Sequence, residues 1–233
     1  MSAHYFVSDA HLGAAPAASE DRLVRFLRSI RGRADSLFIL GDLFDFWFEY
    51  GRAIPKHGFR VLAELNELRR TGTRIVYLCG NHDIRFRGFF EESLGIDTGT
   101  VLDETIDGLR VHARHGDEID TRPVSRLFRR LMRSRLNNFL YSFVHPDIGI
   151  GFAGWVAGRS RARGKDSSLP DVMRSHARTL LQADCDVVVL AHLHHPELLD
   201  TGSGIYLNTG DWIRHFTYGL IRDGRVTLGR FQS

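Results

Sequence analysis

Five polar clusters, each placed directly after a strand-like apolar run, constrain the fold of this chain more than any other feature of its sequence. The apolar runs lie at His4–Ser8, Ser36–Leu40, Arg74–Cys79, Arg110–His115 and Asp186–Leu190. The clusters that follow them are Asp9-Ala10-His11, Gly41-Asp42-Leu43-Phe44-Asp45, Gly80-Asn81-His82-Asp83, His115-Gly116-Asp117 and His192-Leu193-His194. Ligands of open α/β sheets bind beyond the carboxyl ends of the strands, so we expect these clusters to meet in one crevice.

The stretches between the apolar runs have helical periodicity, which predicts a layered α/β fold. Amphipathic helices are predicted at Glu20–Arg31, Phe59–Arg70 and Asp171–Gln182. A further strand is predicted at Ile205–Asn208, and Asp223-Gly224 between two apolar runs is typical of a β-hairpin. With 43% hydrophobic and 25% charged residues, the composition is that of an ordinary globular domain, so we expect one domain over residues 1–233.

The segment at about residues 121–166 interrupts this alternation and is predicted to be a helical insertion. Ser125–Val144 has the pattern of one amphipathic helix. Its apolar side consists of Leu127, Phe128, Leu131, Met132, Leu136, Phe139, Leu140 and Phe143, and its other side of Arg126, Arg129, Arg130 and Arg133. Ten Lys or Arg residues and one acid lie between Arg122 and Lys165, on a chain of net charge +3, so we expect this segment to meet an anionic group. The alternative is a core helix with a solvated basic face.

Cysteine content and hydropathy indicate a cytoplasmic protein. The two cysteines, Cys79 and Cys185, are too few for a disulfide framework and are typical of a reducing compartment. No apolar run is long enough to span a membrane. Asp9 and His11 interrupt the first apolar run, so a cleaved secretory signal is not expected.

The side chains of the five clusters have the chemistry of a two-metal site. An isolated histidine or Gly-Asn turn is usually structural, but here every cluster contains metal-competent side chains. Carboxylates, imidazoles and an amide oxygen, without thiolates, favour Mn²⁺ or Mg²⁺, with Fe²⁺ or Zn²⁺ as alternatives. Two such ions about 3.5–4 Å apart can grip a phosphoryl oxygen and activate water. One carboxylate must bridge them, and the Gly41-Asp42 step at a strand end is suited to that role.

The patterns D-x-H, G-D-x-x-D, G-N-H-D and the late H-x-H resemble those of the calcineurin-like metallophosphoesterase superfamily over nearly the whole core. The resemblance implies a β-sandwich flanked by helices, in αββα layers. It also implies two metal sites that share Asp42 as the bridging ligand. The first would consist of Asp9, His11, Asp42 and His194, and the second of Asp42, Asn81, His115 and His192.

The remaining histidines receive different roles. By the same resemblance, His82 approaches the leaving group as an acid or charge stabiliser, oriented by Asp45. His112 is an alternative ligand to His115, which we favour because Gly-Asp follows it. His195 and His215 lie near the site in sequence and are candidates for contact with a substrate phosphate, whereas His4, His57, His145 and His176 are predicted to be structural or surface residues.

More specific features resemble the UDP-2,3-diacylglucosamine hydrolases over essentially the whole chain. They are Gly41–Tyr50 (GDLFDFWFEY), His115-Gly116-Asp117, the basic insertion with His145-Pro146-Asp147, and Leu207–Trp212 (LNTGDW). The resemblance implies Mn²⁺-dependent hydrolysis of this nucleotide-linked glycolipid to UMP and 2,3-diacylglucosamine 1-phosphate (lipid X) in lipid A synthesis. The best-known branch of that family has Arg where His82 stands.

A substrate with two acyl chains and a pyrophosphate requires an apolar groove beside a cationic patch. The insertion offers Leu127, Phe128, Met132, Phe139 and Phe143 for the groove, and Arg159, Arg161, Arg163 and Lys165 for the charge. Asn81, His82 and His195 are further predicted substrate contacts. A basic amphipathic helix also suits peripheral contact with the inner face of the cytoplasmic membrane. No nucleic acid and no protein partner is predicted.

Three alternatives use the same features differently. Another phosphodiesterase, acting on cyclic or dinucleotide substrates, would share the metal site but would not need an apolar groove. A nuclease would use the basic segment for nucleic acid and show a steep salt dependence of binding. A non-catalytic adaptor would have kept the fold and lost the chemistry, which the complete set of expected ligands argues against.

Overall fold

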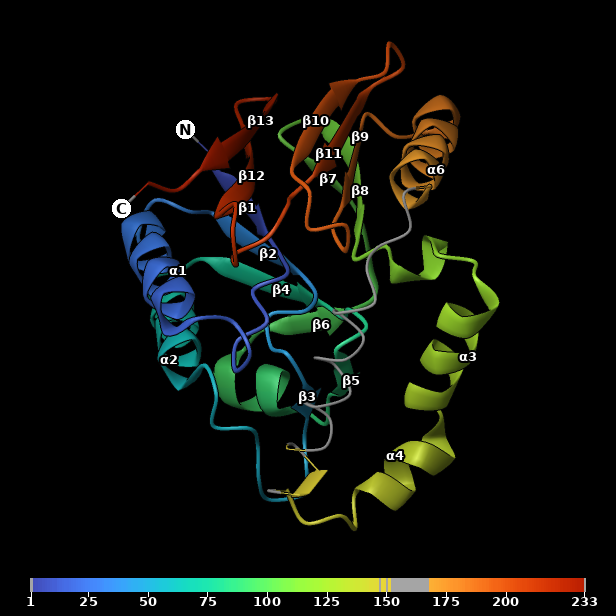
Figure 1. The fold of residues 1–233 in the computed structure, drawn as a ribbon. Coiled ribbons are helices and arrows are strands. Elements are labelled where there is room, and N and C mark those ends of the chain that lie inside the picture. The colour runs from blue at the N-terminus through green and yellow to red at the C-terminus, as the bar shows by residue number, and fades with distance from the viewer. Residues whose placement is uncertain (1, 147, 150, 152–167, 233) are drawn as a thin grey trace.

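Two β-sheets packed face to face form the centre of the protein, and helices cover the outer face of each sheet (Figure 1). The computed structural model describes residues 2–146, 148, 149, 151 and 168–232. Four basic residues predicted to contact substrate or membrane, Arg159, Arg161, Arg163 and Lys165, lie outside the described residues, as does Asp147.

The first sheet has six strands in the order β13-β12-β1-β2-β4-β6. They are β1 (His4–Val7), β2 (Ser36–Leu40), β4 (Arg74–Leu78), β6 (Asp97–Gly99), β12 (Thr217–Arg222) and β13 (Arg225–Arg230). Strands β1, β2, β4 and β6 are parallel, and β12 joins β1 antiparallel. The predicted hairpin is confirmed: Asp223 (φ 50°) and Gly224 (φ 72°) both have the positive φ that a tight β12–β13 turn requires.

The second sheet has five strands in the order β10-β11-β9-β8-β7. They are β7 (Val101–Ile106), β8 (Leu109–Arg114), β9 (Val187–Leu190), β10 (Glu197–Asp200) and β11 (Ile205–Asn208). The three predicted strands β8, β9 and β11 are parallel neighbours in its centre. The edge strands β7 and β10 were not predicted, because they contain polar residues and no continuous apolar run marks them.

Alternation along the central strands builds the core in layers. In β1, Tyr5 and Val7 pack toward the helices while Phe6 packs between the two sheets. Phe6 stacks on Phe38 of β2 with ring centroids 4.8 Å apart, and both rings are buried. Because both faces of these parallel strands are covered, they are apolar throughout, which is the reason why the sequence marks them so clearly.

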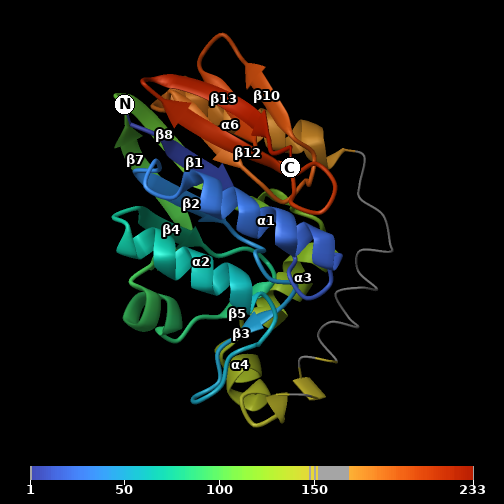
Figure 2. The ribbon, with the colours of Figure 1, turned by 90° about the vertical axis from the view of Figure 1, so that its left-hand side faces the viewer.

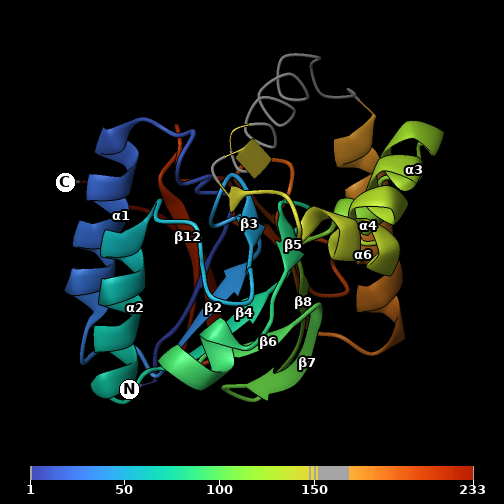
Figure 3. The same ribbon diagram turned by 90° about the horizontal axis from the view of Figure 1, so that it is seen from below.

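Helices complete the predicted αββα layers, which Figure 3 shows from below. Helices α1 (Ala17–Ile30) and α2 (Phe59–Arg70) lie side by side on the six-stranded sheet (Figure 2), joined by ion pairs such as Arg28–Glu64. Helix α6 (Leu169–Ala183) covers the five-stranded sheet, with Met173 and Ala177 fully buried beneath it. A π-helical turn, η1 (Phe89–Ser93), packs Phe90 into the core beside α2.

The parallel strands of both sheets bring their carboxyl ends to one edge of the sandwich, and this edge positions the site. Two short strands pair there, β3 (Trp47–Phe48) and β5 (Asp83–Arg85), so that the loops after β2 and β4 are held together. The Trp47 amide donates to the His82 carbonyl at 3.0 Å. The five polar clusters all lie at this edge, as predicted.

The predicted single helix at Ser125–Val144 is wrong in one respect, because two helices occupy this range. Helix α3 (Pro123–Met132) ends at Arg133, and α4 (Arg135–Tyr141) begins after Ser134, whose Oγ accepts from the Asn137 amide at 3.4 Å. A serine side chain that caps a new helix competes with continuation of the old one. Helix α3 lies beside the sandwich, and α4 lies below β3 and β5 (Figure 1). The predicted insertion boundaries of 121–166 stay a prediction, since residues 152–167 are not described.

No helix among the described residues combines the length and the apolar character needed to cross a membrane. Cys79 and Cys185 are both free thiols, as expected from their number.

Candidate metal centre

Five non-glycine residues at the carboxyl ends of the strands have a left-handed backbone. They are Asp9 (φ 51°), His11 (φ 44°), Asp42 (φ 54°), His192 (φ 66°) and His194 (φ 56°). A residue held in such a conformation costs of order 1–3 kcal/mol, and these residues concentrate at functional sites. All five belong to the set that the sequence predicts as metal ligands.

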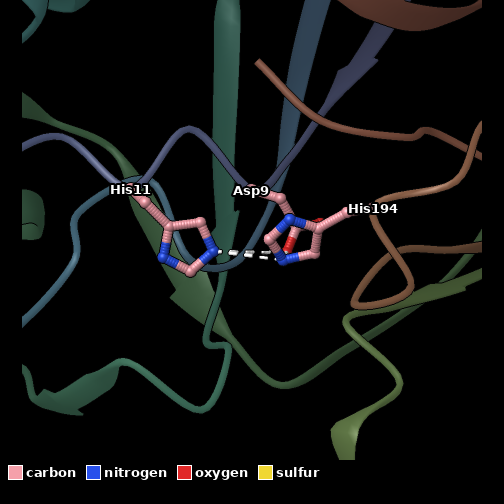
Figure 4. A group of neighbouring side chains, drawn as sticks. All are labelled: Asp9, His11 and His194. Atoms are coloured by element: carbon pink, nitrogen blue, oxygen red, sulfur yellow. Dashed lines mark hydrogen bonds and ion pairs between the residues drawn. The ribbon is translucent and has the colours of Figure 1, made fainter. Parts of the chain in front are cut away.

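A first group of donor atoms comes from the loops after β1 and β9. The atom Asp9 Oδ1 lies 3.1 Å from His194 Nε2 and 3.8 Å from His11 Nε2. The two imidazole Nε2 atoms are 3.3 Å apart. Figure 4 shows the three side chains pointing toward one another. Neighbouring ligands of an ion bound at about 2.1 Å stand about 3 Å apart, so the spacing fits a divalent ion.

The hydrogen bonding of Asp9 leaves one oxygen for a cation. Its Oδ2 accepts from Ser8 Oγ at 2.7 Å and from the His192 amide at 3.1 Å. Its Oδ1 is buried, and its neighbours among the described residues are the Nε2 atoms of His194 and His11, at 3.1 and 3.8 Å. A buried carboxylate oxygen without a well-aligned donor is costly, and a bound metal ion would compensate it.

A second group of donors surrounds His115. Its Nδ1 donates to the Leu40 carbonyl at 2.7 Å, which leaves the lone pair on Nε2. That Nε2 lies 3.2 Å from Asn81 Oδ1, 3.2 Å from His192 Nδ1 and 3.4 Å from Asp42 Oδ2. The second predicted ligand set therefore also converges, from the loops after β2, β4, β8 and β9.

Asp42 lies between the two groups. Its Oδ2 is 3.4 Å from His115 Nε2 and 3.9 Å from His11 Nε2, so one carboxylate faces both sets of imidazoles. Two glycines permit this position: a Cβ on Gly41 would lie 2.6 Å from the Gly80 backbone, and a Cβ on Gly80 would overlap the Asp42 carboxylate. Asp42 therefore lies between the two donor groups, the position expected of the predicted bridging ligand.

Burial and neighbouring charges shift the pKa values of these groups in opposite directions. Burial alone would raise the pKa of the Asp9 and Asp42 carboxyls, but the nearby imidazoles lower both well below the ordinary range. Burial alone would lower the pKa of His11, yet Asp45 and Asp9 raise it to about 9. The pKa of His115 is also raised, because Asp42 outweighs its burial. Without metal, protons on His11 and His115 balance the ionised carboxylates.

His82 lies beside the metal donors, as predicted, but its contact with Asp45 differs from the expectation. Its Nδ1 donates to the backbone carbonyl of Asp45 at 2.5 Å, while the Asp45 carboxylate is 3.9 Å away. That carboxylate lies closer to His11 Nδ1, at 3.5 Å. A carboxylate behind a metal-binding histidine fixes the orientation of its ring. Asp45 therefore faces both His82 and His11, through different atoms.

A match to a protein-family model identifies the kind of site that these residues form. Residues 5–196 match the model of the calcineurin-like phosphoesterases, a range that includes all five polar clusters. The chain belongs to the calcineurin-like phosphoesterase family. Members of this family use divalent metal ions, and both donor groups of this chain fit such ions. The protein is accordingly a metal-dependent hydrolase.

Relatives within the calcineurin-like phosphoesterase family match nearly the whole chain. A UDP-2,3-diacylglucosamine hydrolase of Porphyromonas gingivalis is 31% identical over 93% of this chain and 92% of its own length. The Ralstonia nicotianae protein of the same name is also 31% identical, over 89% of this chain and 83% of its own length. A solved structure, described as a novel archaeal phosphodiesterase, shares the fold with a TM-score of 0.52 at 13% identity, over 97% of this chain and 98% of that one.

Asp83 is a buried residue of the metallophosphoesterase site to which the sequence analysis assigned no role. Its Oδ2 accepts from the amides of Asp42 (3.0 Å) and Gly80 (2.8 Å), and its Oδ1 accepts from Tyr77 Oη at 2.7 Å. It therefore ties together the two loops that hold Asp42 and Asn81. The only sequence signal was its place at the end of the Gly80-Asn81-His82-Asp83 cluster, which did not reveal its hydrogen-bond partners.

Asp211, in the LNTGDW stretch, plays a similar part on the other side of the site. It is 2% exposed, and its Oδ1 accepts from the amides of Ile213, Arg214 and His215. Its Oδ2 lies 3.3 Å from His215 Nδ1 and 3.8 Å from His194 Nδ1. The carboxylate thus lies behind His194, one of the predicted metal ligands.

The other predicted site residues take distinct places. His112 faces away from the metal donors, with its Nδ1 2.6 Å from Asp103 Oδ1, which supports the choice of His115 over His112. His195 is exposed next to His194, and its ring lies 6.3 Å from that of His215. Among the groove residues, Leu127, Phe139 and Phe143 are exposed, Met132 is half-buried, and the side chain of Phe128 is not described.

Proposed function

We propose that the protein hydrolyses the pyrophosphate bond of UDP-2,3-diacylglucosamine to UMP and 2,3-diacylglucosamine 1-phosphate, a step of lipid A synthesis. The supporting observations are the convergence of Asp and His donors at the carboxyl ends of the strands and the exposed apolar side chains on α3 and α4, in a chain similar over nearly its whole length to proteins named UDP-2,3-diacylglucosamine hydrolase. Water attacks the α-phosphorus, the bond from that phosphorus to the bridging oxygen breaks, and the sugar 1-phosphate leaves.

Two Mn²⁺ ions are the proposed cofactors. Asp9, His11, Asp42 and His194 would hold one ion, and Asp42, Asn81, His115 and His192 the other. When bound, the ions polarise the phosphoryl oxygens and lower the pKa of a coordinated water. Oxygen and imidazole donors without thiolate support Mn²⁺ over softer alternatives.

The chain's own residues supply proton transfer and substrate contact. Because His82 Nδ1 donates to a carbonyl, its Nε2 faces the metal groups and, once protonated, can stabilise or protonate the leaving phosphate. Asn81, His82 and His195 are the proposed contacts to the pyrophosphate among the described residues. Arg159, Arg163 and Lys165, outside the described residues, are proposed on sequence alone to add positive charge.

Exposed apolar side chains of the insertion support a lipid substrate and peripheral contact with the inner face of the cytoplasmic membrane. They are Leu127, Leu131, Leu136, Phe139, Leu140 and Phe143, each more than half exposed. Exposed apolar patches of this kind mark interaction sites. Flotation with anionic phospholipid vesicles tests the membrane contact: the protein should float with vesicles at low salt, and recovery entirely in the pellet fraction would reject it.

Product analysis tests the reaction. The protein is incubated with Mn²⁺ and UDP-2,3-diacylglucosamine in H₂¹⁸O, and products are analysed by mass spectrometry. We expect ¹⁸O in UMP, none in the sugar 1-phosphate, and no turnover after chelation. Label in the sugar 1-phosphate would reject α-phosphorus attack. Absence of turnover together with hydrolysis of bis(p-nitrophenyl) phosphate would reject the lipid substrate while leaving the metal site in place.

A further inference from the structure

The four arginines predicted on the basic side of α3 do not share one environment. Arg126 and Arg130 are exposed. Arg129, whose side chain is 17% exposed, contacts the core, and so does the end of the Arg133 side chain, which is 39% exposed. Two of these four cations therefore form contacts with the core, and Arg133 does so from the surface.

Arg129 and Arg133 grip the turn that follows the metal ligand His115. This turn, η2 (Asp117–Ile119), begins two residues after the ligand. Arg129 Nη1 donates to the Asp117 carbonyl, and its Nη2 to the Asp120 carbonyl at 3.3 Å. Arg133 Nη2 lies 3.3 and 3.4 Å from the two carboxylate oxygens of Asp117.

Arg133 also contacts the second ligand loop. The same Nη2 lies 3.4 Å from the carbonyl of Gly80, the residue before Asn81. Asn81 and His115 come from different sheets, and their donor atoms are 3.2 Å apart. One guanidinium at the end of α3 therefore joins the loops of two neighbouring metal donors.

Because Asp117 is buried, its contact with Arg133 affects the stability of the turn after His115. Its side chain is 3% exposed, so its carboxylate needs a nearby cation, and the described cations within 4 Å are Arg129 and Arg133. Removal of Arg133 would leave the buried carboxylate with Arg129 alone, at 3.8 Å, and would remove the contact that joins the Asp117 turn to the Gly80 carbonyl. Groups behind metal ligands set ligand orientation and basicity in this way.

We propose that Arg133 is a positioning residue of the second metal group. Through Arg133, the insertion fixes the loops of Asn81 and His115 relative to each other. The inference rests on the metal ligation in the proposed function and not on the identity of the lipid substrate. Arg133 contacts the loops that carry Asn81 and His115. Among the described residues, it does not contact the loops that carry Asp9 and His194, the first donor group. The two metal sites should therefore respond differently to its loss.

The test compares Arg133→Ala with Arg126→Ala, an exposed arginine of the same helix, as the full-length protein. Binding of Mn²⁺ is measured by calorimetry and electron paramagnetic resonance, and hydrolysis of bis(p-nitrophenyl) phosphate over a range of Mn²⁺ concentrations. For Arg133→Ala we expect one of the two Mn²⁺ affinities to fall about tenfold while the other stays unchanged. Turnover lost at low Mn²⁺ should return at high Mn²⁺, and Arg126→Ala should match the wild type.

Unchanged affinity at both sites in Arg133→Ala would overturn the inference, and so would an equal loss at both. If Arg133→Ala does not fold, as judged by circular dichroism, Arg133→Gln is measured in the same way and decides the question by the same outcomes. A wild-type protein that binds no Mn²⁺ would instead reject the metal ligation on which the proposed function rests, so the two failures are distinguishable.

Discussion

Close approach of two glycines decides where the shared carboxylate lies. Gly41 and Gly80 belong to loops of neighbouring strands, and their backbones are near enough that neither tolerates a Cβ without displacement. Asp42 follows Gly41 with φ 54°, so its side chain is directed between the two donor groups by the backbone itself. The absence of a Cβ at Gly41 and at Gly80 therefore allows the Asp42 carboxylate to occupy this position.

The substitution Gly80→Ala should therefore disturb metal binding more than folding. Its methyl group would overlap the Asp42 carboxylate and displace the bridging position. We expect Mn²⁺ affinity and turnover to fall at least about tenfold. Gly99→Ala in β6 is the matched control, because its Cβ would meet Leu78 at an ordinary 3.7 Å. Equal behaviour of the two variants would contradict this account.

Proton competition at His11 predicts the pH dependence of metal binding. In the metal-free protein the pKa of His11 is raised to about 9 by Asp45 and Asp9 against its burial. At neutral pH the ring is thus protonated, and a metal ion must displace that proton. The competition weakens as the pH rises toward 9, so Mn²⁺ affinity should rise about tenfold per pH unit for each proton displaced. Calorimetry from pH 6.5 to 8.0 in buffers of different ionisation enthalpy measures it, and an affinity independent of pH would refute it.

At the scale of the elements, the break between α3 and α4 determines the direction in which the exposed apolar side chains of α4 point. Ser134 starts a new helix, so Leu136, Phe139 and Leu140 are placed by α4 and not by a continuation of α3. Tyr141 anchors α4 through ring contacts with Phe46 (5.6 Å) and Phe48 (4.8 Å) at the start of β3. The insertion is thus attached to the same loops that hold Asp45 and His82.

Replacement of Phe143 separates lipid recognition from the chemistry. Phe143 is 73% exposed and contacts Phe139 with ring centroids 5.0 Å apart. We expect Phe143→Asp to raise KM for UDP-2,3-diacylglucosamine about tenfold, because burying one aromatic side chain contributes about 1.5–3 kcal/mol. Activity on bis(p-nitrophenyl) phosphate should not change. Val172→Asp, at an exposed apolar position of α6, is the control, and an equal rise in KM there would point to a nonspecific effect.

Across the whole molecule, the metal centre joins the two sheets. Asp9, Asp42 and Asn81 follow strands of the six-stranded sheet, and His115 and His192 follow strands of the five-stranded one. Ions held by both should stabilise the sandwich as a unit, because binding to the folded state alone lowers its free energy.

Removal of metal should accordingly lower the melting temperature. A ligand at 100 times its Kd contributes about 2.7 kcal/mol, which corresponds to about 5–10 °C for a chain of this size. Calorimetric scans with Mn²⁺ and with EDTA measure the difference. Asp42→Ala and His115→Ala should keep the fold by circular dichroism, lose nearly all turnover and show a smaller shift. Full activity in either variant would refute the ligand assignment.

Much of the fold and the metal donors could be predicted from sequence, because both depend on local patterns. Parallel strands buried on both faces are continuous apolar runs, and their ligands follow directly at the carboxyl ends. The three predicted helices and the central strands are confirmed for this reason. Strands β3 and β5 were missed because they are two or three residues long and exist only through pairing with each other.

What the sequence by itself determined is the order and chemical type of the predicted metal donors, since each follows its strand by one to four residues. The tertiary structure decided which neighbouring residues contact these predicted donors and their loops. Asp45 meets His82 through its carbonyl, and Arg133 contacts the core while Arg126 stays exposed. Such choices depend on contacts between residues tens of positions apart, whose distances follow from the packing of layers and not from the periodicity of any single segment.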